Sequence, residues 1–103
     1  MLLWFSVTPI GTSSASVSDE VARAVAAARA TGARCSTDAS GTLVEGSWQE
    51  CTDALRAAAD AVLDVAPRVS ITAKLDVRTD KPDQRGEDKM ASLEQSMEEH
   101  DRR

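Results

Sequence analysis

The chain has 103 residues, which suits one small domain, and its formal net charge is −5. A nucleic-acid-binding protein needs a cationic surface to displace the counterions of phosphates, so the acidic balance excludes nucleic acid as the expected partner and favours a neutral or cationic small molecule. Two cysteines, Cys35 and Cys51, and one histidine, His100, form no cluster with zinc-ligand spacing, so we expect free thiols, no metal and no cofactor.

The first predicted element is a strand over residues 2–9. Side chains alternate along it as in a strand with one buried face. That face holds Leu3, Phe5 and Val7, and the opposite face holds Trp4, Ser6 and Thr8. The small residues of 11–16 then predict a loop.

The N-terminal segment does not match a targeting or membrane segment. No Lys or Arg precedes Arg23, so the charged start of a secretory signal is missing. The apolar run is also far shorter than the roughly 18 to 20 residues that span a bilayer. We therefore expect a cytoplasmic protein without a membrane partner.

An alanine-rich helix is predicted over residues 17–31. Ser16 and Asp19 have the spacing of a capping box, and Gly32 stands where a helix-ending glycine is wanted. The expected apolar stripe is narrow and consists of Val17, Val21, Val25 and Ala28. Such small side chains predict a helix that lies close against a sheet.

Two short strands, 34–39 and 42–47, follow with a turn at Ser40–Gly41 between them. Ser47 and Glu50 form a full capping box, which predicts a helix that runs to about residue 65, before Pro67. Its expected buried face is Cys51, Leu55, Ala58, Val62 and Val65.

The last predicted strand covers residues 68–78 and has one apolar face, made of Val69, Ile71, Ala73, Leu75 and Val77. The order β-α-β-β-α-β predicts an α+β, ferredoxin-like sandwich over residues 1–78, with a four-stranded antiparallel sheet and two helices on one face. Trp4 would lie on the other face, so we expect something, such as a second subunit, to cover it.

Residues 79–103 form a charged C-terminal tail. Met90, Leu93 and Met97 have the i, i+3, i+7 spacing of a helix face. This pattern is compatible with a short helix that docks on a neighbour, and the composition is equally compatible with a disordered tail.

Catalytic templates are poorly matched. There is no Gly-rich phosphate loop and no G-x-S-x-G elbow, and His100 lies in the tail. Asp38 and Glu45 across the hairpin are the only candidate acid–base pair, and hairpin carboxylates are commonly solvated. We therefore expect a protein that is not an enzyme.

Hydroxyls and carboxylates at strand ends predict a binding pocket instead. In the ferredoxin-like order the first and third strands are neighbours, so Ser6 and Thr8 are expected to face the region of Glu45, whose carboxylate would accept from an amine. The residues alone are equally compatible with solvated strand positions.

Three motifs, in order, resemble a known family. They are S-V-x-P-x-G at residues 6–11, T-x-x-E-G at 42–46 and P-R-V-S-x-x-x-K-x-D-x-R at 67–78. Together they resemble the thiamine-binding protein family, also called the YkoF-like or UPF0045 family, over about residues 3 to 78. The resemblance implies a ferredoxin-like fold, homodimers or homotetramers formed through sheet faces, and binding of thiamine or its hydroxymethylpyrimidine part without catalysis.

Carried over residue by residue, the resemblance implies a ligand site built from the first strand, the hairpin and the fourth strand. Its members would be Ser6, Thr8, Pro9, Ile10, Thr37, Asp38, Thr42, Glu45, Lys74 and Asp76. Trp48 or Trp4 would offer an aromatic face to the thiazolium cation. Two alternatives stay open: an oligomerisation module without a ligand, and an acylphosphatase-like hydrolase, for which the Arg-bearing phosphate loop is missing.

Overall fold

The computed structural model describes residues 1–102, and these fold into a four-stranded sheet with three helices. The elements are β1 (Leu2–Ile10), α1 (Ser18–Ala30), β2 (Arg34–Thr37), β3 (Thr42–Glu45), α2 (Trp48–Leu63), β4 (Arg68–Asp76) and α3 (Gly86–Asp101).

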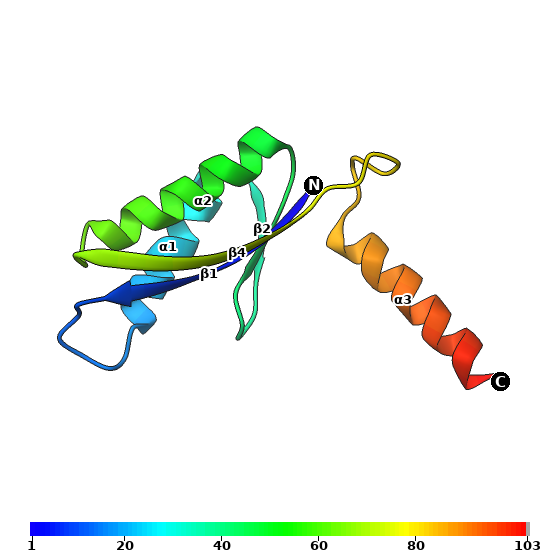
Figure 1. Ribbon diagram of the computed structural model, residues 1–103, viewed down its shortest axis with the longest axis horizontal. Coiled ribbons are helices and arrows are strands. Elements are labelled where there is room, and N and C mark those ends of the chain that lie inside the picture. The colour runs from blue at the N-terminus through cyan, green and yellow to red at the C-terminus, as the bar shows by residue number, and fades with distance from the viewer. Residues whose placement is uncertain (103) are drawn as a thin grey trace.

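All strand pairs are antiparallel, and the sheet order is β2-β3-β1-β4. The helices α1 and α2 pack against each other and cover one face of the sheet, while α3 extends away from the body (Figure 1). This arrangement confirms the predicted ferredoxin-like sandwich.

The core lies between the sheet and the α1–α2 layer. Leu3 and Phe5 of β1 are fully buried, as is Val44, which pairs with Leu3 in the register. Burying a side chain of this size contributes about 1.5–3 kcal/mol. The helices meet this layer mainly through alanines, namely Ala24, Ala28, Ala54 and Ala58. Their small side chains let the helix backbones approach the sheet closely.

The first turns of α1 and α2 test the two predicted capping boxes. In α2 the predicted capping box is confirmed, since the Glu50 N–H donates to Ser47 Oγ at 3.1 Å and the Ser47 N–H donates to Glu50 Oε1 at 3.0 Å. In α1 the predicted box of Ser16 and Asp19 is wrong, because the N-cap residue is Val17 and no side chain caps it. The Ser16 N–H bonds instead to Ser14 Oγ at 3.2 Å within the preceding loop.

The fourth strand is shorter and more exposed than predicted. It ends at Asp76, and Leu75 and Val77 are 42% and 50% exposed. Only Val69 and Ile71 pack against the core. The difference arises because β4 is an edge strand, with β1 alone beside it. The predicted end of α2 changes too, as Val65 lies beyond the helix and is exposed.

The charged tail is helical over α3, and this helix docks on the sheet of its own chain. Its first turn contacts the sheet face that α1 and α2 leave uncovered, whereas none of its residues is buried. The rest of α3 projects from the body, and the described chain is 54 Å long (Figure 1).

Candidate functional site

The structure divides most of the predicted site residues between two cavities. We name the first the hairpin pocket. It lies beside the turn between β2 and β3 and has a volume of about 220 Å³. Its lining includes Ser6 of β1, Val21 and Val25 of α1, and Thr37, Asp38, Gly41 and Thr42 of the hairpin.

The edge of β1 contributes backbone groups to this pocket. The ladder between β1 and β3 ends at the pair Phe5↔Thr42, whereas the ladder between β1 and β4 continues to Ile10. From Ser6 onward, β1 is therefore unpaired on the side that the hairpin pocket faces. An unpaired strand edge offers alternating N–H donors and C=O acceptors.

Two threonines form a hydroxyl pair in the hairpin pocket. Thr37 Oγ1 and Thr42 Oγ1 lie 3.0 Å apart, and either can donate. Thr42 is only 2% exposed. Each hydroxyl has one hydrogen, so the pair retains one more donor after its mutual bond is made.

Asp38 supplies a carboxylate at the pocket. Its Oδ1 accepts from the Ser40 N–H at 2.8 Å, the Ser40 hydroxyl at 2.7 Å and the Gly41 N–H at 3.2 Å. These hydrogen bonds, that of the Ser40 hydroxyl first, lower the pKa of Asp38. The lowered pKa favours the ionised carboxylate. Within residues 1–102 no hydrogen bond engages Oδ2, so this oxygen is available as an acceptor.

Gly41 allows the hairpin turn to lie directly against β1. A Cβ there would stand 2.6 Å from the Phe5 carbonyl oxygen and 2.7 Å from the indole ring of Trp4. Any larger residue would push the turn away from β1 and widen the pocket.

The second cavity, which we name the open-face cavity, lies between the uncovered face of the sheet and the first turn of α3. Its volume is about 540 Å³. The lining includes Leu2, Trp4, Leu43, Glu45, Lys74 and Asp76 from the sheet, and Gly86, Lys89 and Met90 from α3.

Glu45 and Asp76 hold α3 in place. Glu45, whose side chain is 12% exposed, accepts the Gly86 N–H at 2.8 Å through Oε1, and its Oε2 lies 3.2 Å from Arg34 Nε. Asp76 forms an ion pair with Lys89, and the hydrogen bond from Lys89 lowers the pKa of Asp76. Both carboxylates are thus engaged by cationic or N–H groups.

The expectation that Ser6 and Thr8 face the Glu45 region is wrong. In the antiparallel register Glu45 lies opposite Leu2, whereas Ser6 lies beyond the last β1–β3 pair. Thr8 lies opposite Ser70 on β4. With Pro9, which is buried, and Ile10, which is 37% exposed, it lines neither of the two cavities.

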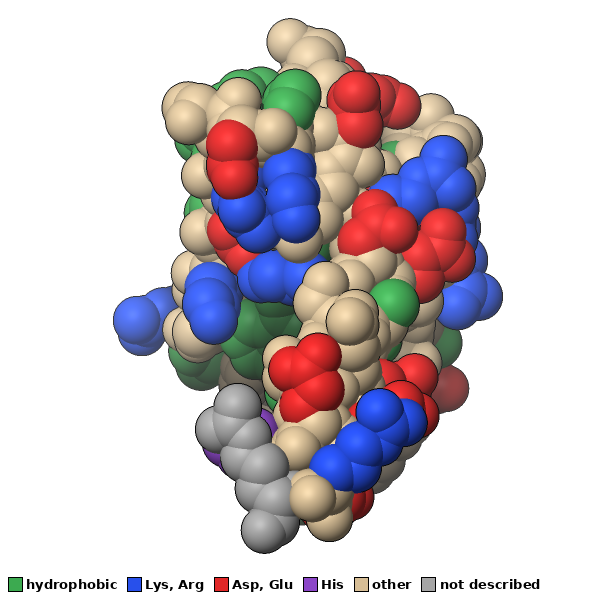
Figure 2. All heavy atoms as spheres, turned by 90° about the vertical axis from the view of Figure 1, so that its right-hand side faces the viewer, with side chains coloured by type: hydrophobic (Ala, Val, Ile, Leu, Met, Phe, Trp, Pro, Cys, Tyr) green, Lys and Arg blue, Asp and Glu red, His purple; other side chains and the backbone are tan. Residues whose placement is uncertain are grey.

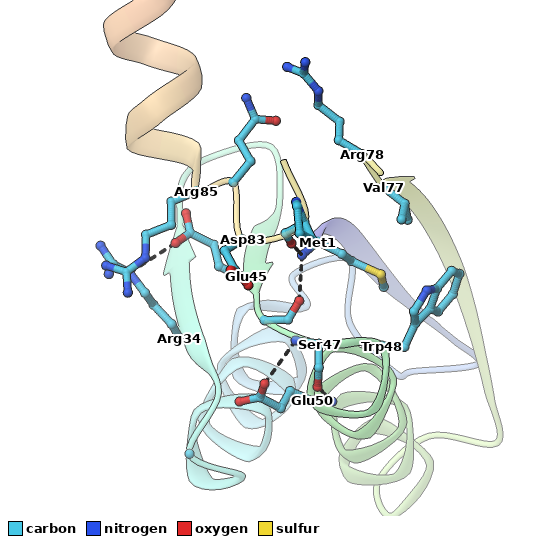
Figure 3. Close-up of a pocket in the computed structure, with 14 residues that line it drawn as sticks. Met1, Arg34, Glu45, Ser47, Trp48, Glu50, Val77, Arg78, Asp83 and Arg85 are labelled. Atoms are coloured by element: carbon cyan, nitrogen blue, oxygen red, sulfur yellow. Dashed lines mark hydrogen bonds and ion pairs between the residues drawn. The ribbon is translucent and has the colours of Figure 1, made fainter. Parts of the chain in front are cut away.

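Trp48 belongs to a third pocket, near the N-terminus of α2, with a volume of about 680 Å³. In Figure 3 its ring lies with Met1 and Val77, away from Arg34 and Arg85 across the pocket. The Trp48 side chain is 57% exposed and is therefore an accessible aromatic surface.

The surface around α3 mixes charges of both signs. Figure 2 shows acidic and basic side chains interspersed over the face from which α3 projects, with hydrophobic side chains between them.

Three contributors to the two cavities were not predicted from the sequence, namely the β1 edge, Gly86 and Lys89. The sequence held one signal for them, which is that Gly86 is a glycine within a charged segment, where a close backbone contact favours glycine.

Residues 1–102 hold neither a metal-binding cluster nor a membrane-spanning helix. Within this range no group of three or more His, Cys, Asp or Glu side chains is placed to hold a metal ion. None of the helices in the same range is both long and apolar enough to cross a membrane.

The protein is a ferredoxin-like sandwich with a small hydroxyl-lined pocket at the unpaired edge of β1. The family model described as thiamine-binding protein matches residues 3–94, and the chain belongs to this family. The match reaches into α3, beyond residue 78, where the motifs end.

Similar proteins come from bacteria and archaea. The UPF0045 proteins Mb1933 of Mycobacterium bovis and MT1949 of Mycobacterium tuberculosis are each 39% identical over 79 residues, which is 76% of this chain and of theirs. The solved structure of the hypothetical protein MJ1052 from Methanocaldococcus jannascii has a TM-score of 0.81 at 32% identity, over 89% of this chain and 93% of that one.

A third similarity concerns the fold alone. TM0486 of Thermotoga maritima, whose name proposes a role in thiamine biosynthesis or salvage, has a TM-score of 0.75 at 20% identity, over 89% of this chain and 96% of that one.

Proposed function

We propose that the chain binds thiamine or its hydroxymethylpyrimidine part in the hairpin pocket, without catalysing a reaction. One observation carries the proposal. The pocket brings Ser6, from the first family motif, together with Thr37, Asp38 and Thr42 around the hairpin, beside the unpaired edge of β1. The family to which the chain belongs supports the same ligand class.

The chemistry of an aminopyrimidine suits these groups. Its exocyclic amine is a donor, which the free oxygen of Asp38 can accept, and its ring nitrogens are acceptors for the threonine hydroxyl pair. A pocket of about 220 Å³ is small for the whole thiamine molecule and fits a single ring with its substituents. The thiazolium cation would then extend outward, where the ionised Asp38 and the net charge of −5 favour it.

Titration calorimetry with thiamine, and separately with hydroxymethylpyrimidine, tests the proposal. Thr42→Val removes the buried hydroxyl and keeps the shape of the side chain. We expect micromolar binding in the wild type and a loss of about tenfold or more in this variant. The matched control is Thr72→Val on β4, which lies outside the pocket and should bind as the wild type does.

Two outcomes would contradict this assignment. Binding that survives in Thr42→Val but is lost in Glu45→Gln would move the site to the open-face cavity. No heat with either ligand, from a protein that still forms a stable oligomer, would favour the alternative of an oligomerisation module without a ligand.

We also propose that the chain forms homo-oligomers in the cytoplasm. Met90, Leu93 and Met97 of α3 are each more than half exposed at helical spacing, on a helix without any buried residue. Trp4 and Leu43 lie on the sheet face that α1 and α2 leave uncovered, and the first turn of α3 contacts part of that face. The two cysteines are free thiols, as is usual in a reducing compartment.

Light scattering after size-exclusion chromatography tests self-association. Leu93→Glu places a charge in the apolar stripe, and we expect it to shift the protein toward monomers. Ser92→Glu adds the same charge one position away and should leave the assembly unchanged. A wild type that is monomeric at every concentration would contradict the proposal.

A further inference from the structure

The turn between β2 and β3 forms one wall of the hairpin pocket and carries the Asp38 carboxylate and the Thr37–Thr42 hydroxyl pair. The Gly41 carbonyl accepts the Asp38 N–H at 3.0 Å, and the Gly41 N–H donates to Asp38 Oδ1 at 3.2 Å. Thr42 follows Gly41 directly in the chain. A shift of the Gly41 backbone would therefore move both the carboxylate and the hydroxyl pair.

Two groups of β1 fix how closely this turn approaches. A Cβ at Gly41 would stand 2.6 Å from the Phe5 carbonyl oxygen and 2.7 Å from Cε2 and Cζ2 of Trp4, so the glycine backbone packs directly against both groups. Trp4 is paired with Leu43 in the β1–β3 register, and Gly41 lies two residues before Leu43. The indole ring thus makes the diagonal contact that long aromatic side chains make between neighbouring strands.

Trp4 acts on the hairpin pocket from outside it. The indole lines the open-face cavity and not the hairpin pocket, whose wall is completed by Val21 and Val25 of α1 on the helix side of the sheet. The Gly41 turn therefore lies between the indole ring and the pocket. Because this contact is made within one chain, it is kept when a second subunit covers Trp4.

We propose that Trp4 is a positioning residue for the pyrimidine site, and that its contact with Gly41 restricts this site to single-ring aminopyrimidines. The inference rests on the proposed function of the hairpin pocket. The indole ring holds the turn against β1, which keeps the pocket at about 220 Å³. A fused two-ring compound such as 4-aminoquinazoline has the same amine and ring nitrogens, so only its size distinguishes it from the single ring.

Calorimetric titration of the full chain with hydroxymethylpyrimidine and with 4-aminoquinazoline tests the proposal through the ratio of the two affinities. We expect the wild type to favour the single ring by about tenfold or more. Gly41→Ala pushes the turn away from β1, so it should weaken hydroxymethylpyrimidine and bring the two affinities close together. Trp4→Phe shortens the side chain that supports the turn and should shift the ratio in the same direction by about threefold.

The ratio separates positioning from a general loss of stability, which would weaken both ligands alike. Gly86→Ala is the matched control, because it places a methyl group 2.9 Å from Glu45 Oε1 and Leu43 Cδ2, outside the hairpin pocket. It should keep the wild-type ratio. In Trp4→Phe/Gly41→Ala the changes should be less than additive, since part of the ring that the new Cβ meets is gone. Circular dichroism checks that each variant is folded.

The outcomes distinguish failure of this inference from failure of the proposed function. No binding of hydroxymethylpyrimidine to the wild type would reject both. Binding of hydroxymethylpyrimidine that depends on Thr42, with equal affinity for 4-aminoquinazoline, would overturn the inference alone. A wild-type ratio that Gly41→Ala or Trp4→Phe leaves unchanged would also overturn it, as would strictly additive effects in the double variant.

Discussion

The helices α2 and α3 have the same length, 16 residues each, and entirely different support. Four residues of α2 are buried, Cys51, Ala54, Ala58 and Val62, whereas α3 has none. An isolated helix of this length is marginal in water, so tertiary contacts decide whether it persists. The core holds α2 along its whole length, while polar contacts of the first turn hold α3.

The largest contrast is expected from truncating one apolar side chain in each helix. Val62→Ala empties part of the core and should lower the free energy of unfolding by about 2 kcal/mol. Leu93→Ala removes a half-exposed side chain and should change the unfolding of the dilute monomer by less than about 0.5 kcal/mol. Urea denaturation measures both, and equal losses would show that α3 is part of the cooperative core.

The capping residues give a smaller contrast. Ser47→Ala removes the hydroxyl that caps α2 and should cost about 1 kcal/mol of global stability. In α3, Asp88 accepts the Arg85 N–H at 3.0 Å, so Asp88→Ala should accelerate amide exchange of α3 without altering global unfolding. A global loss in the second variant would contradict this separation.

Gly86→Ala separates helix propensity from docking, because the two predict opposite changes in the stability of α3. Alanine has the higher helix propensity, so it would stabilise α3 if docking did not matter. The new Cβ, however, would stand 2.9 Å from both Glu45 Oε1 and Leu43 Cδ2. We expect α3 to lose about 1 kcal/mol of local stability, which is measured as faster amide exchange of its backbone. Ser96→Ala, at an exposed α3 position, is the control and should not destabilise the helix.

The smallest effect concerns pH. The hydrogen bond from Lys89 lowers the pKa of Asp76 in the folded chain, so this contact stabilises α3 fully above the ordinary Asp pKa of about 3.9. The contribution is lost as the pH falls through the lowered folded pKa. Helical circular dichroism from pH 6 to pH 2 should show a step that Asp76→Asn removes, and an unchanged profile in that variant would exclude Asp76 as the cause.

The fold followed from the sequence because its signals are local. Alternation in β1 and the Ser47–Glu50 box each depend on residues a few positions apart. Docking of α3 depends on Glu45 and Gly86, which are separated by 41 positions, and no periodicity encodes such a pair. The sequence accordingly left the tail open between a helix and disorder.

The candidate site was predictable in composition and not in arrangement. The predicted site included Ser6, Thr37, Asp38 and Thr42, which the structure brings together. It also included Glu45 and Asp76, which the register places at the other end of β1. Side-chain patterns identify polar strand ends, but the unpaired edge of β1 arises from the lengths of neighbouring strands.

Burial of Cys51 has a consequence for measuring how this protein opens. Its side chain is fully buried, and loss of solvent raises the pKa of the thiol. The thiolate is the reactive species, and the buried thiol is both protonated and inaccessible. An alkylating reagent therefore modifies Cys51 only when the α2 layer separates from the sheet. The rate at which Cys51 is labelled consequently measures how often the core opens.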